Sequence, residues 1–151
     1  MMRQFLTLLI AFICLTTVSV GQSAAVKTRI KEAEKSYHAG KYSNALIKLE
    51  QAEKVAGKAN SSILYWRILA QRALLPGVKA PAFYTNMKKF EELEILRENC
   101  SIYLKNYGKL AALNEQSNKV YQVQQSLKGY PVAKVEFDEI MHLRNAIKSN
   151  H

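Results

Sequence analysis

The stretch from Ala33 to Ala52 restricts the fold of this chain more than any other part of the sequence. Apolar and small residues recur in it at helical spacing, stop at Gly40-Lys41-Tyr42, and then recur at the same spacing. Because glycine favours the left-handed backbone conformation that ends many helices, this pattern predicts two short helices joined by a tight turn. Each helix of such a hairpin can bury its apolar stripe against the other.

The sequence beyond residue 21 keeps this helical period and shows no alternating pattern typical of strands. Its prolines, Pro76, Pro81 and Pro131, all lie between periodic segments, where they interrupt no helix. We therefore predict an all-α fold of stacked antiparallel hairpins. It has about six helices, near residues 23–39, 43–56, 60–74, 82–106, 114–128 and 134–148.

The apolar stripes of the later helices indicate which residues should pack into the core. The fourth predicted helix carries Phe90, Leu93, Leu96, Cys100, Tyr103 and Tyr107. The fifth is expected to turn Val120, Tyr121, Val123 and Leu127 inward. The last carries Val135, Phe137, Ile140, Met141, Leu143 and Ile147. Cys100 is expected to be a buried apolar thiol, and as the one cysteine after the leader it has no internal disulfide partner.

The first 21 residues are predicted to be a secretory signal peptide. One basic residue, Arg3, precedes the uncharged apolar run Phe5–Val20, and small residues end the segment at Gly21. Cleavage after Gly21 would leave residues 22–151 as a single helical domain in the periplasm, in the cell envelope or outside the cell. The alternative is a retained membrane anchor, although a run of about 16 residues is shorter than the roughly 20 that span a bilayer. A lipid attachment at Cys14 is disfavoured because Ile13, before it, is not small.

The chain is basic, with a formal net charge of +10 that falls by one if the leader is removed. This balance favours contact with anionic surfaces such as phospholipid head groups, acidic glycans or acidic proteins. The basic residues are spread along every predicted helix with no run of five, which is typical of ordinary solvated faces. Nucleic acid is not an expected partner of an exported protein.

The hairpin resembles a tetratricopeptide repeat in the residues Gly40, Tyr42, Ala45, Leu49 and Ala52. These match the repeat's turn glycine, its aromatic residue, its two small residues and the bulky residue between them. The resemblance is strongest over residues 26–75, where Ile63, Trp66 and Ala70 continue it. It implies stacked hairpins, of which about three are normally needed for stability. The chain departs from the pattern in the spacing before Gly40, in the longer link at residues 76–81 and in the last two helices.

The resemblance implies a concave groove lined by the first helix of each hairpin. Carried over by position, its expected partner-binding residues are Lys31, Lys35, His38, Arg67, Gln71 and Arg72. The spacing before Gly40 leaves two groove positions open. One is Lys27 or Thr28, and the other is Glu34 or Lys35. A groove with these basic residues would prefer an acidic partner or a C-terminal carboxylate. The asparagines of the family's carboxylate-holding version are absent.

No pattern of catalytic or metal-binding residues stands out. The acidic cluster Glu91, Glu92, Glu94 and Glu98 is not interpreted as catalytic, because Lys88 with Glu92 and Glu94 with Arg97 have the spacing of ordinary helix-surface pairs. The three histidines lack metal-ligand spacing. We therefore expect a non-enzymatic adaptor that binds a protein or peptide without a cofactor. The alternative is a basic helical module that docks on an anionic membrane or glycan surface. The partner's identity and the oligomeric state stay open.

Overall fold

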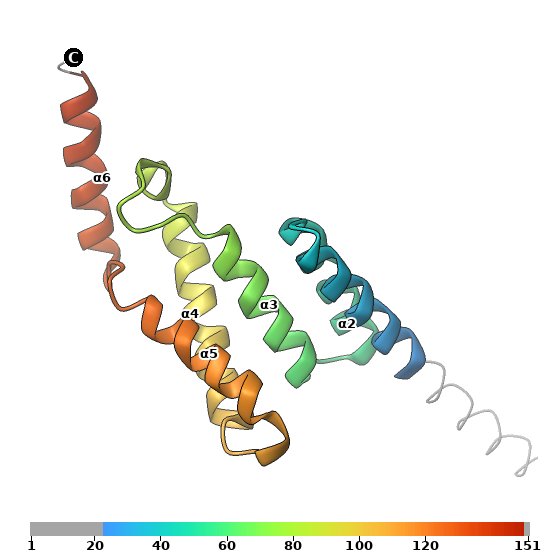
Figure 1. Ribbon diagram of the computed structural model, residues 1–151. Coiled ribbons are helices and arrows are strands. Elements are labelled where there is room, and N and C mark those ends of the chain that lie inside the picture. The colour runs from blue at the N-terminus through green and yellow to red at the C-terminus, as the bar shows by residue number, and fades with distance from the viewer. Residues whose placement is uncertain (1–22, 150–151) are drawn as a thin grey trace, which may run out of the picture. The chain divides into compact units, whose positions relative to one another are not determined.

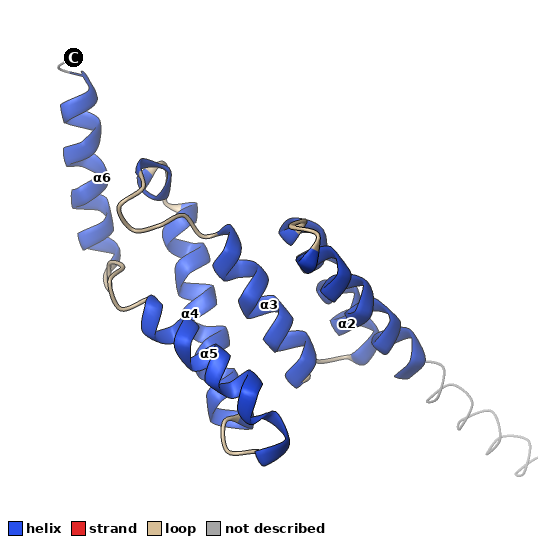
Figure 2. Cartoon of the chain, in the orientation of Figure 1, coloured by secondary structure: helices blue, strands red, loops and turns tan. Residues whose placement is uncertain are grey.

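The computed structural model describes residues 23–149, so the predicted leader lies outside the described residues. These residues contain helices and no strand, which confirms the all-α fold (Figures 1 and 2). Residues 23–38 are helical and precede five further α-helices and two short 3-10 helices. Their bounds are α2 Tyr42–Ala56, α3 Ser61–Leu74, η1 Pro81–Tyr84, α4 Lys88–Tyr107, η2 Ala111–Leu113, α5 Asn114–Ser126 and α6 Lys134–Ser149.

The chain divides into two compact units, and the boundary falls within α3, between Ile63 and Leu64. The prediction of one domain over residues 22–151 stays a prediction. Across residues 23–149, no helix combines the length and the apolar character needed to cross a bilayer.

The first unit contains an antiparallel helical hairpin. The guanidinium of Arg29 donates a hydrogen bond to the side-chain oxygen of Gln51, and the Lys48 ammonium lies 2.9 Å from Glu32. The earlier residue on the first helix, Arg29, pairs with the later residue on α2, Gln51. The two helices therefore run in opposite directions. The pairing confirms that the chain returns on itself in this region.

The turn of this hairpin forms at Gly40, as the sequence predicts. Gly40 has a φ of 71°, and its N–H donates to the carbonyl of Tyr37 at 2.9 Å. The N–H of Lys41 donates to the carbonyl of Ser36 at 2.9 Å, so the two bonds make a Schellman cap. A side chain at Gly40 would be strained in this left-handed conformation.

Small side chains on α2 allow the hairpin to pack closely. Ala45, Leu49 and Ala52 are all buried, as is Ala33 on the first helix. The third helix then begins at a cap made by Asn60, whose side-chain oxygen accepts the N–H of Ile63 at 3.0 Å. This contact makes Asn60 the N-cap of α3.

The second unit is organised around α4, which packs against α5 and η1. Six of its side chains are buried: Phe90, Leu93, Leu96, Asn99, Cys100 and Tyr103. The predicted stripe is confirmed at five of these positions, and Asn99 is an addition. The Asn99 amide donates to the side-chain oxygen of Gln71 on α3 at 2.9 Å, so this buried polar group is satisfied.

The prediction of one long helix near residues 82–106 is wrong. A 3-10 turn ends at Tyr84, and α4 begins only at Lys88. Between them, the Thr85 hydroxyl donates to the carbonyl of Ala82 at 3.1 Å. Threonine and asparagine side chains compete with helical hydrogen bonds in this way, and Asn86 follows directly. The interruption leaves Phe83 and Tyr84 buried on η1 rather than on a continuous helix.

Phe137 holds the last helix, α6, in an aromatic cluster with η1. Its ring centroid lies 5.4 Å from that of Phe83, 5.2 Å from that of Tyr84 and 5.6 Å from that of Phe90. Phe137 is completely buried, whereas Val135, Leu143 and Ile147 on the same helix are 62–66% exposed. Figure 1 shows the second half of α6 extending past η1.

One inward residue predicted for the fifth helix is also wrong. The structure buries Val120, Val123 and Leu127 but leaves Tyr121 54% exposed. Ser117 on α5 is also buried. The reason is geometric, because Tyr121 lies about 100° around the helix from Val120.

Candidate functional site

A row of lysines occupies the outer face of the first helix. Lys27, Lys31 and Lys35 lie four residues apart, which places them one above the other on one side of the helix. All three are exposed, while Val26 and Ala33 on the opposite side are buried. We call Lys27, Lys31 and Lys35 the lysine row.

A shallow hollow of about 530 Å³ lies beside the first two lysines of this row. It is lined by residues of the first helix and by Ser62 at the start of α3, namely Ala24, Lys27, Thr28, Ile30, Lys31 and Ser62. Its walls are largely apolar, and two ammonium groups stand among them. The hollow can therefore take an apolar side chain whose neighbour carries negative charge.

The acidic residues of this helix leave the lysine row positively charged. Glu32 lies on another side, where a hydrogen bond and the charge of Lys48 lower the pKa of its carboxyl. Glu34 lies half-buried at the edge of the row and offsets part of its charge. Three lysines against one nearby carboxylate give this face a net positive charge.

The sequence-predicted site residues fall into two groups. Lys31, Lys35 and His38 lie exposed on the first helix, within the first unit. His38 also contacts the ring of Tyr37, with the two ring centroids 5.6 Å apart. The structure brings Lys31 and Lys35 onto one face and adds Lys27, which the sequence left as one of two choices.

Arg67, Gln71 and Arg72 lie on α3 in the second unit and are half-buried. Gln71 accepts the hydrogen bond from Asn99 described above. The Arg72 guanidinium donates to the Ser126 hydroxyl at 3.1 Å and lies 5.9 Å from the centre of the Tyr130 ring. Gln71 and Arg72 therefore join α3 to other parts of the second unit.

Arg97 on α4 is the most heavily bonded polar side chain described in the second unit. Its guanidinium lies 2.7 Å from Glu94 and donates to the carbonyls of Leu127, Tyr130 and Pro131 at 3.3, 3.1 and 2.9 Å. A planar guanidinium with several donors suits such a cluster of acceptors. The sequence predicted the pair with Glu94 but not the carbonyls, because these come from a turn about 30 residues further along.

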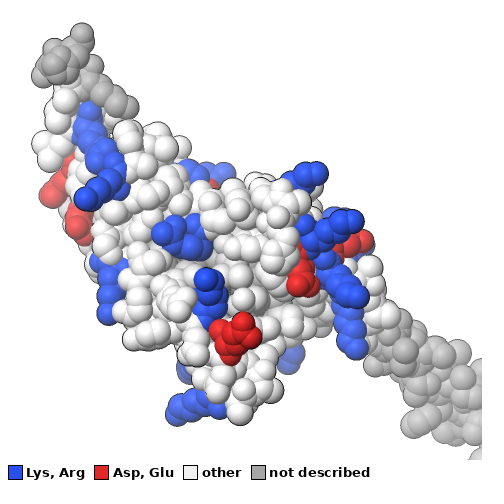
Figure 3. All heavy atoms as spheres, in the orientation of Figure 1, with Lys and Arg blue, Asp and Glu red and all other residues white. Residues whose placement is uncertain are grey.

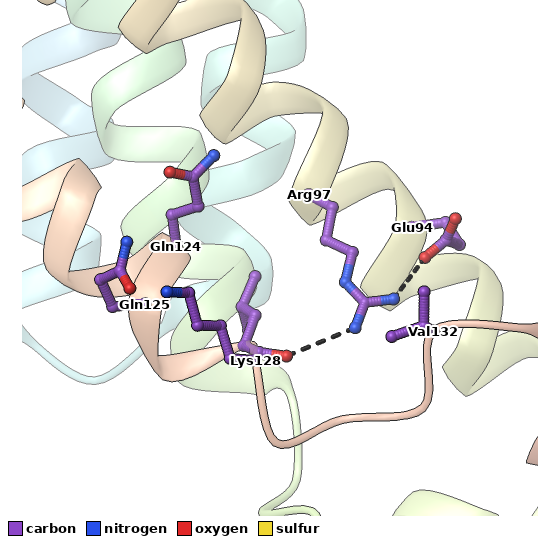
Figure 4. A pocket seen from close by; sticks show the side chains of 7 residues that line it. Glu94, Arg97, Gln124, Gln125, Lys128 and Val132 are labelled. Atoms are coloured by element: carbon purple, nitrogen blue, oxygen red, sulfur yellow. Dashed lines mark hydrogen bonds and ion pairs between the residues drawn. The ribbon is translucent and has the colours of Figure 1, made fainter.

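A second hollow, of about 440 Å³, lies next to Arg97. Figure 4 shows Gln124 and Gln125 on α5, Lys128 in the turn that follows it, and Val132 at one side of the hollow. Arg97 points across it toward the turn that follows α5. Since the Arg97 donors are directed at protein carbonyls, the guanidinium fixes this turn rather than presenting a free charge.

The one free cysteine of the described part of the chain is buried, and its acidic and histidine side chains form no metal-holding group. Burial raises the pKa of the Cys100 thiol from 9.0 to about 12, so the thiol is neutral and inert at ordinary pH. Residues 23–149 contain no group of three or more histidine, cysteine or acidic side chains placed to hold a metal ion.

Basic side chains do not gather into one continuous patch on the face shown in Figure 3. They stand in separate groups, and some lie beside acidic side chains. The lysine row is therefore distinguished by its regular spacing and its neighbouring hollow rather than by charge alone. No protein-family model matches the chain, and neither a curated protein nor a solved structure matches it.

Proposed function

We propose that this protein is an exported, tetratricopeptide-like binding module that holds an acidic segment of another protein on its first helix. The observation that supports this proposal best is the lysine row beside the 530 Å³ hollow. Ammonium groups at regular helical spacing attract a row of carboxylates, and the hollow accepts an apolar side chain between them. Binding is an equilibrium on a preformed surface and needs no cofactor or chemical step.

The geometry of the hairpin supports a preformed surface. The first helix is held to α2 by the Arg29–Gln51 hydrogen bond, by the Glu32–Lys48 ion pair and by buried small side chains. None of these contacts uses the lysine row. A partner can therefore bind the row without disturbing the packed side of the hairpin, and it avoids the cost of ordering the helix.

A peptide titration tests this proposal directly. The probe is a fluorescent peptide in which glutamates alternate with leucines, and its control has glutamines in place of the glutamates. Lys31→Glu is expected to weaken binding of the acidic peptide about tenfold, because it reverses a charge next to the hollow. Lys119→Glu, at an exposed position on α5 in the second unit, is the matched control and should change the affinity less than twofold.

The alternative function, docking on an anionic surface, is supported by the same row of exposed lysines. Vesicles with and without phosphatidylglycerol separate the two functions. Binding to the anionic vesicles, lost as salt is added, with no binding to the acidic peptide would favour the membrane or glycan module. Equal binding of the glutamate and glutamine peptides would contradict the acidic-segment function, and equal binding to vesicles with and without phosphatidylglycerol would contradict the alternative.

Export is a separate part of the proposal and has its own measurement. Mass spectrometry of the protein from cells that express the full chain should show a mature N-terminus at Gln22. A protein that keeps Met1 or Met2 and sediments with the membrane would instead support a retained anchor.

A further inference from the structure

Another hollow, of about 350 Å³, lies within the second unit where the last helix passes the 3-10 turn η1. Its lining residues come from these two parts of the chain, namely Pro81, Tyr84, Thr85, Arg144, Asn145 and Ile147. The walls are mainly apolar, and Arg144 is the charged residue among these six. A single guanidinium therefore stands at the edge of an apolar hollow.

The two sides of this hollow are already held together. Phe137 on α6 is completely buried, and its ring lies 5.4 Å from that of Phe83 and 5.2 Å from that of Tyr84 on η1. Arg144 follows seven residues later and so lies on the same side of α6. A ligand in the hollow does not have to bring α6 and η1 together, which lowers the cost of binding.

The guanidinium of Arg144 packs on a ring but keeps its charge and its donors. It is half-buried and lies 4.7 Å from the centre of the Tyr84 ring. Burial raises the pKa of the Tyr84 phenol, so this ring is neutral at ordinary pH and does not cancel the charge. No hydrogen bond or ion pair joins the Arg144 guanidinium to another residue within positions 23–147. Its N–H groups are therefore available to an acceptor from outside the chain.

We propose that this hollow binds a small monocarboxylate that carries an apolar body, such as an arylalkanoic acid. The two carboxylate oxygens match two N–H donors of the planar guanidinium. The apolar body lies against Pro81 and Ile147. Ile147 is 62% exposed, so the ligand covers apolar surface that otherwise contacts water.

The charges around the hollow favour one negative charge over two. Burial is the largest cause of the raised pKa of the Tyr84 phenol, and the nearby charges of Arg144 and Glu136 act on it in opposite directions. A carboxylate therefore stands near the same ring as the guanidinium. It accepts the N–H of Val132 at 2.9 Å. A phosphate dianion would be repelled by Glu136 and would have one cation to bind, whereas a monocarboxylate needs only one.

A titration with 3-phenylpropionate, followed by the amide signals of the purified protein in NMR spectra, tests the proposal. We expect saturable binding with a dissociation constant between about 0.1 and 1 mM. The largest shifts should fall on Thr85, Arg144 and Asn145. The site lies in the second unit, so the proposal does not depend on the lysine row. No saturable shift up to about 10 mM, or largest shifts at Lys27 and Lys31, would overturn it.

Analogues of the probe separate the parts of the ligand. 3-Phenylpropanol has the body without the charge, and acetate has the charge without the body. Each should bind at least about tenfold more weakly than 3-phenylpropionate. Phenyl phosphate, which is largely doubly charged at neutral pH, should also bind more weakly. Equal or tighter binding of the alcohol, of acetate or of the phosphate would contradict the proposal.

A peptide distinguishes a small acid from the end of a polypeptide. Acetyl-Ala-Ala-Phe carries the same carboxylate and ring at its C-terminus. It should bind more weakly than 3-phenylpropionate, because the hollow of about 350 Å³ has walls for a small ligand only. Tighter binding of the peptide would overturn the small acid in favour of a polypeptide C-terminus.

Substitutions of Arg144 test its role in the same titration. Arg144→Gln should raise the dissociation constant of 3-phenylpropionate at least about tenfold. Arg144→Lys keeps the charge but lacks the planar fork, and we expect about a threefold rise. Lys105→Gln, at an exposed position on α4 outside the hollow, removes the same charge and should change the constant less than about twofold. An unchanged affinity in Arg144→Gln, or equal weakening in Lys105→Gln, would mean that Arg144 does not bind the ligand.

A second pair of variants tests the apolar wall without altering Arg144. Ile147→Ala should raise the dissociation constant about threefold, because it removes part of the surface that the ligand covers. Val135→Ala is the matched control, since Val135 is 63% exposed on the same helix and does not line the hollow. Circular dichroism should show both variants folded. Equal affinities of these two variants for 3-phenylpropionate would place the ligand elsewhere.

Discussion

The helices α4 and α6 differ in how much of their apolar surface is covered, although both carry apolar residues at helical spacing. Six side chains of α4 are buried, whereas Phe137 is the one buried side chain among those described on α6. The difference follows from their neighbours, since α4 contacts α5, η1 and residues of α3, while α6 packs chiefly against η1. Periodicity therefore shows which side of a helix can be buried, and the neighbouring elements decide whether it is.

The largest effect is expected where α6 does have a partner. Phe137→Ala should lower the free energy of unfolding by about 3–5 kcal/mol, because it removes a ring packed against Phe83, Tyr84 and Phe90. Urea denaturation followed by circular dichroism measures this loss. Val135→Ala, on the exposed side of the same helix, is the control and should have almost no effect. A loss below about 1 kcal/mol for Phe137→Ala would show that the cluster does not hold α6.

A matched pair of leucines sharpens the comparison between the two helices. Leu93→Ala on α4 should cost about 2–5 kcal/mol of unfolding free energy, since Leu93 is fully buried. Leu143→Ala on α6 should cost less than about 0.5 kcal/mol in dilute protein, because Leu143 is mostly exposed. Thermal or urea unfolding of the two variants gives the comparison, and equal losses would mean that α6 is covered after all.

A smaller effect is expected at Arg97, which joins α4 to the turn that leads toward α6. Arg97→Lys keeps the charge but lacks the planar fork of donors that reaches Leu127, Tyr130 and Pro131. We expect a loss of about 1–2 kcal/mol in the same urea measurement. Lys105→Arg, an exposed change on the same helix, is the control. A stability equal to that of the original protein would show that the three carbonyl contacts contribute nothing.

Much of the fold could be predicted because its signals are local. Gly40 and the capping residue Asn60 act on their own helix ends, and the buried positions of α4 follow directly from its period. The burial of Phe83 and Tyr84 on a separate turn could not be predicted in this way, because their aromatic cluster depends on Phe137, more than 50 residues later. The carbonyl contacts of Arg97 were missed for the same reason.

The candidate site could be predicted in part. Lys31 and Lys35 were expected on one face from the resemblance, with Glu34 left as the alternative to Lys35, and the structure exposes both lysines on one side of the first helix. The hollow beside Lys31 could not be foreseen, since it also requires Ser62 from another helix. Gln71 and Arg72 were assigned to a groove by resemblance alone, because no local pattern indicates that Asn99 and Ser126 form hydrogen bonds with them.

Amide hydrogen exchange tests most directly whether α4 is enclosed while α6 is held only near Phe137. In dilute protein, the amides between Leu96 and Tyr103 should exchange only through global unfolding. Those from Leu143 to Ile147 should exchange at least about 100-fold faster, through local opening of an uncovered helix end. Equal protection of the two segments would contradict the account.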